Sequence, residues 1–312
     1  MILTGVLFAL PMAIAPVFAR LARRLVSALP AAAAARVIAV GAVVCAVSTA
    51  LSLGLFGCLF VAQLPEVAER GHWSPVALRA QTPLSSVAAA GALVLLGLSL
   101  VSLLCTGSRR ALQVYRAHRT CVLSTAGGSE LVVIAERAPI AYAVPGRPGR
   151  VVISRGLVDA LTEDEQAVVI AHERAHLTGH HHWYRIATGM AAALNPMLAP
   201  ATRAVELATE RWADERAAVE IGSRSRVAAT LARVALLRLR PALGTLGAET
   251  QVAARVEALL QPLPRPNKAV AGAAVALLCL TSATATASVQ HVDHLFDRAS
   301  IVGTSVTGDS TH

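Results

Sequence analysis

The stretch TEDEQAVVIAHERAHLTG, residues 162–179, predicts a single helix with clear signals at both ends. Thr162 followed three residues later by Glu165 has the form of a capping box, in which each side chain accepts a hydrogen bond from the other residue's backbone. The residues that follow, 167–171, are all apolar, and Gly179 offers a stop. The whole stretch is therefore predicted to be helical.

Two histidines and a glutamate on this helix form a candidate zinc-hydrolase pattern. His172 and His176 lie four residues apart, so both imidazoles can face one metal ion. Glu173 is rotated by about 100° from His172. It can therefore stand beside the metal and take a proton from an attacking water instead of acting as a ligand. Such a short pattern arises by chance in roughly one chain in a hundred of this length, so its context has to decide.

The composition is typical of an integral membrane protein. Of the 312 residues 55% are hydrophobic and only 15% are charged, and the mean hydropathy is +0.58. This is too apolar for an ordinary soluble domain. The net charge of +9 could indicate nucleic-acid binding. However, the arginines cluster at the ends of apolar segments and aromatic residues are only 4%, so no direct nucleic-acid binding is expected.

Four apolar segments are predicted to span the membrane as helices. Three of them form an N-terminal membrane region over residues 1–106, a fourth follows a central domain over residues 107–268, and a short tail covers residues 290–312. The predicted spans are about 1–19, 37–63, 84–105 and 269–289.

The distribution of charge predicts the orientation of these spans. Arg and Lys are in excess after the first and third spans and before the fourth, whereas the loop between the second and third mixes both signs. By the positive-inside rule the N-terminus and the tail are expected outside, and residues 107–268 in the cytoplasm. We therefore expect a multi-pass protein of the cell membrane with residues 172–176 on the cytoplasmic side.

The region ahead of the histidines is predicted to contain strands. Residues 131–135 and 150–154 are rich in β-branched side chains, and residues 141–144 form a third candidate strand ended by Pro and Gly. A short helix is predicted over residues 156–161. With the helix at 162–179, these elements predict a small α+β unit.

A zinc site with two histidine ligands needs a third protein ligand and an open position for water. In ELATERWAD, residues 206–214, the side chains of Glu206, Glu210 and Asp214 share one helix face. Three like charges repel each other unless a cation, such as zinc, lies opposite. The alternative is a solvated acidic face paired with neighbouring arginines, and spacing alone does not choose between the two.

Two segments near these motifs are predicted to have structural roles. His180, His181 and His182 follow the motif helix, where cations favour the helix dipole, and this interpretation is preferred over a role in tuning the site. The apolar stretch 186–199 is short for a span, so we expect a helix in the core or at the membrane surface.

The two motifs together resemble those of a known peptidase group. His172-Glu-Arg-Ala-His176 followed by Glu210-Arg-Trp-Ala-Asp214 looks like the HExxH and ExxAD pair of the HtpX-like gluzincin peptidases. Within that group the chain resembles most the BlaR/MecR-type membrane metallopeptidases, over roughly residues 84–260. The resemblance implies α-helical spans around a zincin-like α+β cytoplasmic metallopeptidase domain at residues 107–268.

The resemblance also implies a role for individual residues. It makes Glu173 the general base, and Asp214 the residue that orients a ligating histidine. The implied ligands of one Zn²⁺ per chain are His172, His176 and Glu210. The outer strand that would pair with an extended substrate comprises Tyr142, Ala143 and Val144.

The expected activity is that of a zinc metalloendopeptidase, EC 3.4.24 class, acting on protein substrates at the cytoplasmic face of the bilayer. Cleavage of a transcriptional repressor is the preferred role, with quality control of membrane proteins as an alternative. A zinc-bound signalling scaffold without turnover is a further alternative, although it would not need Glu173. The tail, about 23 residues, is too short for an external sensor domain. The sequence does not indicate an oligomeric state.

Overall fold

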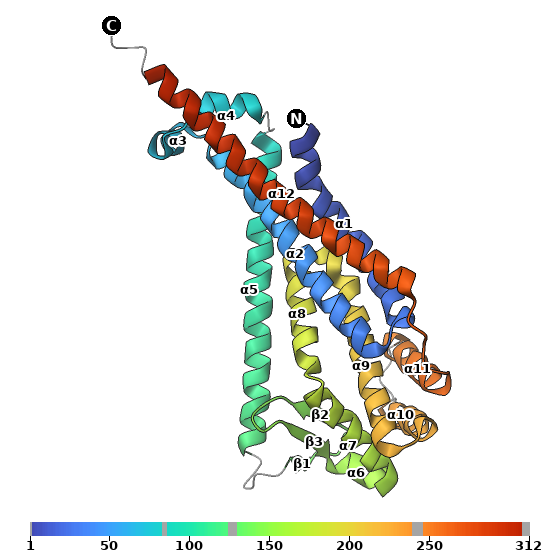
Figure 1. Ribbon diagram of the computed structural model, residues 1–312. Coiled ribbons are helices and arrows are strands. Elements are labelled where there is room, and N and C mark those ends of the chain that lie inside the picture. The colour runs from blue at the N-terminus through green and yellow to red at the C-terminus, as the bar shows by residue number, and fades with distance from the viewer. Residues whose placement is uncertain (1, 83–85, 124–129, 239–245, 308–312) are drawn as a thin grey trace.

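The computed structural model describes residues 2–82, 86–123, 130–238 and 246–307, and shows a helical bundle with a small sheet at one end (Figure 1). In this part of the chain four helices are long: α1 (Ile2–Ala28), α2 (Ala31–Val61), α5 (Ser86–Leu123) and α12 (Lys268–Thr307). Each contains a segment long and apolar enough to cross a membrane: Gly5–Ala28, Ala31–Val61, Val87–Arg116 and Lys268–Ser300. Residues 1, 84–85 and 308–312 of the predicted spans and tail lie outside the described residues.

These helices differ in length from the predicted spans. α1 continues from residue 19 through its arginine cluster to Ala28, and α5 continues from residue 105 to Leu123. The domain predicted to begin at residue 107 therefore starts within α5. Residues 290–307, predicted as part of the tail, instead continue α12. The reason is that long arginine side chains can reach water from the end of a membrane helix, so the helix can continue beyond its apolar segment.

The chain between α2 and α5 explains why α12 stays helical beyond its apolar part. It forms two short helices, α3 (Pro65–Gly71) and α4 (Pro75–Gln81), and α4 packs on the far end of α12. Trp73, between them, lies edge-on to Phe296 of α12, with ring centroids 5.0 Å apart. This aromatic contact covers a face of α12 that would otherwise be exposed to solvent, and so stabilises the helix beyond its apolar part.

Two helices of the central region form a hairpin that enters the bundle (Figure 1). They are α8 (His181–Leu194) and α9 (Ala199–Ile221), joined through the 3-10 turn η1 (Pro196–Leu198). Asn195 at the tip is buried, and its Nδ2 donates to Thr49 Oγ1, 3.2 Å away, in the middle of α2. The hydrogen bond satisfies a polar group that would be costly to leave unpaired there. The residues 186–199, expected as one helix in the core or at the membrane surface, do pack in the core, but the helix ends at Leu194 and the chain turns there into η1 and α9.

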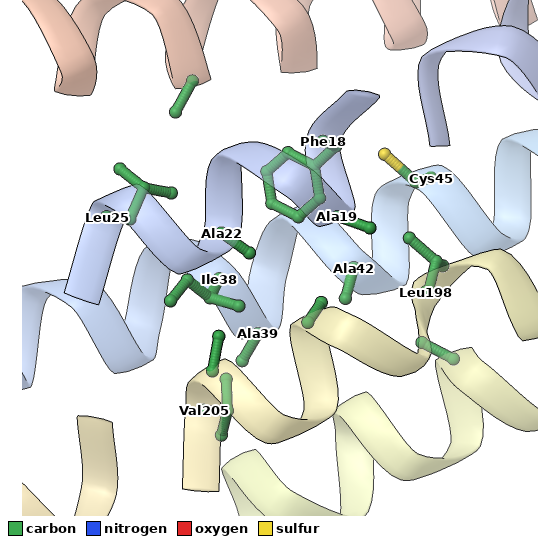
Figure 2. Close-up of a cluster of buried hydrophobic side chains, with 14 of the residues drawn as sticks. Phe18, Ala19, Ala22, Leu25, Ile38, Ala39, Ala42, Cys45, Leu198 and Val205 are labelled. Atoms are coloured by element: carbon green, nitrogen blue, oxygen red, sulfur yellow. The ribbon is translucent and has the colours of Figure 1, made fainter. Parts of the chain in front are cut away.

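The hairpin shares one hydrophobic core with α1, α2 and α12 (Figure 2). Small side chains line the crossing of α1 and α2, which allows the two backbones to approach closely. Gly41 of α2 lies directly beneath the ring of Phe18, where a Cβ would meet the ring carbons at 2.1–2.9 Å. Leu198 and Val205 of the hairpin are fully buried in the same cluster. The central region therefore does not pack as a separate domain.

The sheet lies at the opposite end of α5 from α4 (Figure 1). Its strands are β1 (Leu131–Ile134), β2 (Ala141–Val144) and β3 (Arg150–Ser154), in the order β1-β3-β2. β3 pairs with β1 in parallel and with β2 in antiparallel orientation. The three predicted strands are confirmed to within one residue, and β2 is an outer strand.

The helices α6 (Arg155–Ala160) and α7 (Glu163–Thr178) follow the sheet as predicted, α6 being shifted by one residue. The capping box is confirmed, because Thr162 N donates to Glu165 Oε2 at 2.9 Å and Glu165 N donates to Thr162 Oγ1 at 3.4 Å. Gly179 is the C-terminal cap of α7. Two further helices, α10 (Arg224–Arg238) and α11 (Leu246–Leu260), pack against α7 and α9.

Candidate metal centre

Helices α7 and α9 pack together and bring three potential metal ligands to one point. The Nε2 atoms of His172 and His176 are 3.1 Å apart. Glu210 approaches both rings, with Oε2 3.6 Å from His172 Nε2 and Oε1 3.4 Å from His176 Nε2. Among the described residues these three form the group that could hold a metal, and Glu206 is not part of it.

The spacing of these donor atoms fits a tetrahedral zinc ion. Zinc binds histidine nitrogen and carboxylate oxygen at about 2.0–2.1 Å, so two tetrahedral ligand atoms lie about 3.3 Å apart. The three observed separations of 3.1, 3.4 and 3.6 Å lie close to that value. Two imidazoles and one carboxylate are also a ligand set used by catalytic zinc sites. A zinc ion held by these three residues would keep a fourth position for water or substrate.

Asp214 holds the first histidine in the orientation that metal binding needs. Its Oδ1 lies 3.0 Å from His172 Nδ1, and the carboxylate is only 2% exposed. Because Nδ1–H donates to Asp214, the lone pair of Nε2 is directed at the metal position. Burial disfavours the charged imidazole, but the two carboxylates, Asp214 and Glu210, outweigh it and raise the pKa of His172 to about 9.

His181 contacts the second histidine in a corresponding way. Its Nδ1 lies 2.8 Å from His176 Nδ1, and its side chain is 1% exposed. Burial, with the nearby charge of Arg185, lowers the pKa of His181 to about 4. Burial also lowers the pKa of His176, to about 2, assisted by the charge of His172. The interpretation of His181 as a cation at a helix end was therefore wrong.

The backbone between α7 and α8 explains how His181 reaches this position. His180 adopts a left-handed conformation with φ 51°, which turns the chain sharply after α7. At Gly179 a Cβ would lie 2.3 Å from His181 Nε2 and 2.9 Å from Ala175 O. A side chain at residue 179 would thus displace the imidazole from His176.

Two arginines far apart in the sequence hold the carboxylate of Glu210. Arg185 of α8 donates to Oε1, and Arg255 of α11 lies 2.7 Å from Oε2. Arg255 also forms a two-pronged bond to Asp214, with N–O distances of 2.8 and 2.7 Å. Burial alone would raise the pKa of Glu210, but the interaction with His172 and the charge of Arg255 hold it well below its usual range.

Two of the three acids on this face of α9, Glu210 and Asp214, are therefore paired with arginines of other helices and not with those of α9. The neighbours of Glu210 in the sequence point elsewhere; Arg211, for example, donates to the carbonyl oxygen of Val26 in α1. Sequence reasoning missed Arg185 and Arg255 because both come from other helices. His181 was noted, but its burial depends on the turn at residue 180.

Glu173 lies with the outer strand in the same cavity as the three candidate ligands. The cavity has a volume of about 370 Å³, and its lining includes Glu173, Tyr142 and Ala143. Burial raises the pKa of Glu173, against the lowering effect of His172. Val144, the third residue predicted to contact substrate, instead has its side chain buried within the sheet core.

The chain was compared with known proteins. Residues 110–241 match the model of peptidase family M48. The chain contains an M48 peptidase domain. The matched part of this M48 domain runs from α5 through α10 and includes both motif helices, while α11 with Arg255 lies beyond it. No curated protein and no solved structure gives a significant match. The match to M48 indicates a metallopeptidase, which agrees with the peptidase group named from the motifs.

Proposed function

We propose that this chain is an integral-membrane zinc endopeptidase of the EC 3.4.24 class that cleaves protein substrates. The observation that carries the proposal is the convergence of His172, His176 and Glu210 at tetrahedral spacing, in one cavity with Glu173 and β2. The M48 match supports the peptidase activity, and the four apolar helices support a membrane location.

The three converging side chains would hold one zinc ion, oriented through Asp214 and His181. When bound, zinc supplies a Lewis acid that polarises a carbonyl and lowers the pKa of water to about 7. The remaining steps belong to the protein's own groups.

Glu173 is proposed as the general base. Its carboxylate lies in the cavity next to the ligands, and its burial raises its pKa, which makes the carboxylate a stronger base. It accepts a proton from the attacking water and passes it to the leaving amine. A zinc-bound scaffold without turnover would not require a buried carboxylate at this place.

The outer strand β2 accounts for a polypeptide substrate. Tyr142 and Ala143 line the cavity, and the substrate is proposed to lie along them as an added strand. Main-chain pairing of this kind recognises extended peptide of varied sequence, because the hydrogen bonds come from the backbone. It therefore positions a scissile bond beside Glu173.

The cellular role proposed is regulated cleavage of a transcriptional repressor in the cytoplasm. The cytoplasmic side is supported by the arginine excess at one end of the spans. The repressor is supported by the resemblance to BlaR/MecR-type peptidases.

Substrate trapping with Glu173→Gln tests this function. Wild type and variant are purified from membranes, and both should contain one equivalent of zinc, since Glu173 is not a ligand. We expect peptide-bond hydrolysis only from wild type, and soluble cytoplasmic proteins retained only by the variant. Equal hydrolysis by both proteins contradicts the proposal.

The side of the membrane is tested by labelling introduced cysteines in intact cells. Ser225→Cys lies on the exposed start of α10, near the metal centre, and Glu69→Cys lies on α3 at the other end of the bundle. In a background without the native cysteines, an impermeant maleimide should label Glu69→Cys but not Ser225→Cys. The reverse pattern places the site outside.

A further inference from the structure

A second cavity, of about 650 Å³, lies between α1, α9 and α11 and shares no lining residue with the metal centre. Its polar lining is dominated by guanidinium groups. Arg23 comes from the end of α1, and Arg203 and Arg211 come from α9. The carboxylate that lines it is Glu257 of α11, whose Oε1 accepts a hydrogen bond from Gln261. Three cations thus face one carboxylate.

Two of these arginines are not neutralised within the described part of the chain. Arg23 and Arg203 form no ion pair with any carboxylate described, and both side chains are exposed. Arg211 is half-buried, and one of its nitrogens donates to Val26 O at the end of α1. The cavity therefore has donors that an anionic ligand can use. Planar guanidinium groups match the geometry of phosphate oxygens well.

Apart from Ser27, Gln251 and Gln261, the remaining residues of the lining are apolar. Ala204 and Leu207 lie between the two arginines of α9, and Pro262 and Pro264, from the segment between α11 and α12, add to the apolar lining. A small inorganic anion makes no use of such surface. An amphiphile does, since it carries a phosphate and an apolar part together.

The cavity lies where three of the candidate spans begin or end. Arg23 and Ser27 are in the last turns of the α1 span, which ends at Ala28. The carbonyl oxygen of Ala28 accepts a hydrogen bond of 2.9 Å from Asn267 N, immediately before α12. α2 begins three residues after Ala28. Because the ends of apolar spans lie at the surface of a bilayer, the cavity is expected at the depth of the lipid headgroups.

We propose that this cavity binds the phosphate group of an anionic membrane phospholipid. Arg23 and Arg203 would contact the phosphate, with Arg211 behind it, and the glycerol backbone would lie on Leu207 and the prolines. Basic pockets between membrane helices bind anionic headgroups in this manner. The site is independent of the peptidase chemistry.

Native mass spectrometry of the full chain in detergent tests the site. Phosphatidylglycerol, phosphatidylcholine and glycerol 3-phosphate are titrated in separate experiments. We expect phosphatidylglycerol to bind at least about tenfold more tightly than the other two. Arg23→Gln with Arg203→Gln should weaken its binding by roughly tenfold per guanidinium, because a hydrogen bond to a charged group is lost each time.

The matched control is Arg216→Gln with Arg226→Gln, which removes the same charge from outside the cavity. It should bind as wild type does, and Arg203→Lys should retain most of the binding. An equal loss in the control shows general charge attraction and overturns the proposal. Tight binding of glycerol 3-phosphate would show that the cavity binds soluble phosphate esters and would overturn the proposal that its ligand is a phospholipid. Unchanged binding by the cavity variant, with an unchanged thermal midpoint, overturns the site.

Discussion

His181 Nδ1 lies 2.8 Å from Nδ1 of His176, so one candidate metal ligand is held by a second imidazole. His172 is held differently, by the carboxylate of Asp214 at 3.0 Å. For His176 Nε2 to offer a lone pair to a metal, its Nδ1–H must donate to His181 Nδ1. A neutral acceptor polarises its partner less than a carboxylate does, so the two ligands differ in basicity.

Replacing His181 should weaken zinc binding. His181→Ala removes the acceptor that fixes the tautomer of His176, and we expect a loss of zinc affinity of about 10- to 100-fold. Competition with a chromophoric chelator measures it. His180→Asn is the control, because Asn tolerates the left-handed backbone and residue 180 is exposed. An unchanged zinc affinity in His181→Ala would show that His181 contributes packing but does not orient His176 for metal binding.

The third ligand can be distinguished from its neighbour on the same helix face. Glu210→Ala should abolish stoichiometric zinc binding, since two imidazoles alone leave the tetrahedron incomplete. Glu206→Ala should retain one equivalent, because Glu206 lies outside the converging group. Elemental analysis of the purified proteins gives both values. A full equivalent in Glu210→Ala would exclude Glu210 as a ligand.

Arg255→Gln should destabilise the protein most when zinc is absent. The change leaves the carboxylates of Glu210 and Asp214 buried without their main cation, at a cost of about 3–5 kcal/mol. Zinc would restore positive charge at Glu210, so its addition should recover part of the thermal midpoint. Arg265→Gln, on an exposed linker, is the control. Equal destabilisation with and without zinc would contradict this account.

The capping box should make helix α7 sensitive to acid. The backbone N–H of Thr162, with further help from Arg233, lowers the pKa of Glu165 below its ordinary value. Because the folded-state pKa is the lower one, this stabilisation is present above the unfolded pKa and is lost as the pH falls through the folded pKa. Glu165→Gln should therefore lower the thermal midpoint at pH 7 and have less effect near pH 3. An equal effect at both pH values would argue against the charged cap.

The sequence predicted the parts of the site that depend on local signals. The cap at Thr162 and the stop at Gly179 delimit α7, so the spacing of the two histidines could be converted directly into a shared face. The i, i+4 spacing in α9 likewise indicated Glu210 and Asp214 as candidate site residues on one helix face. β-branched runs located the strands, although not their order in the sheet.

Contacts between distant elements could not be predicted in the same way. Arg255 is 45 residues from Glu210 in the chain, and nothing near it in the sequence indicates that its partner is a buried carboxylate. The burial of His181 follows from a left-handed residue that is not glycine, a conformation that composition does not indicate. The insertion of the hairpin depends on Asn195 finding Thr49, about 150 positions away.

The hairpin also determines whether the proposed peptidase unit can be separated from the long helices. Glu210 stands on the same helix as Ala201, which is buried against α1 and α2, and about 13 Å of rigid rod separates them. Cleaving the chain between α5 and β1 would not liberate a soluble peptidase, because α8 and α9 would still need the long helices to cover their apolar faces. If the four apolar helices span a bilayer as proposed, the peptidase unit stays attached to it after such a cut.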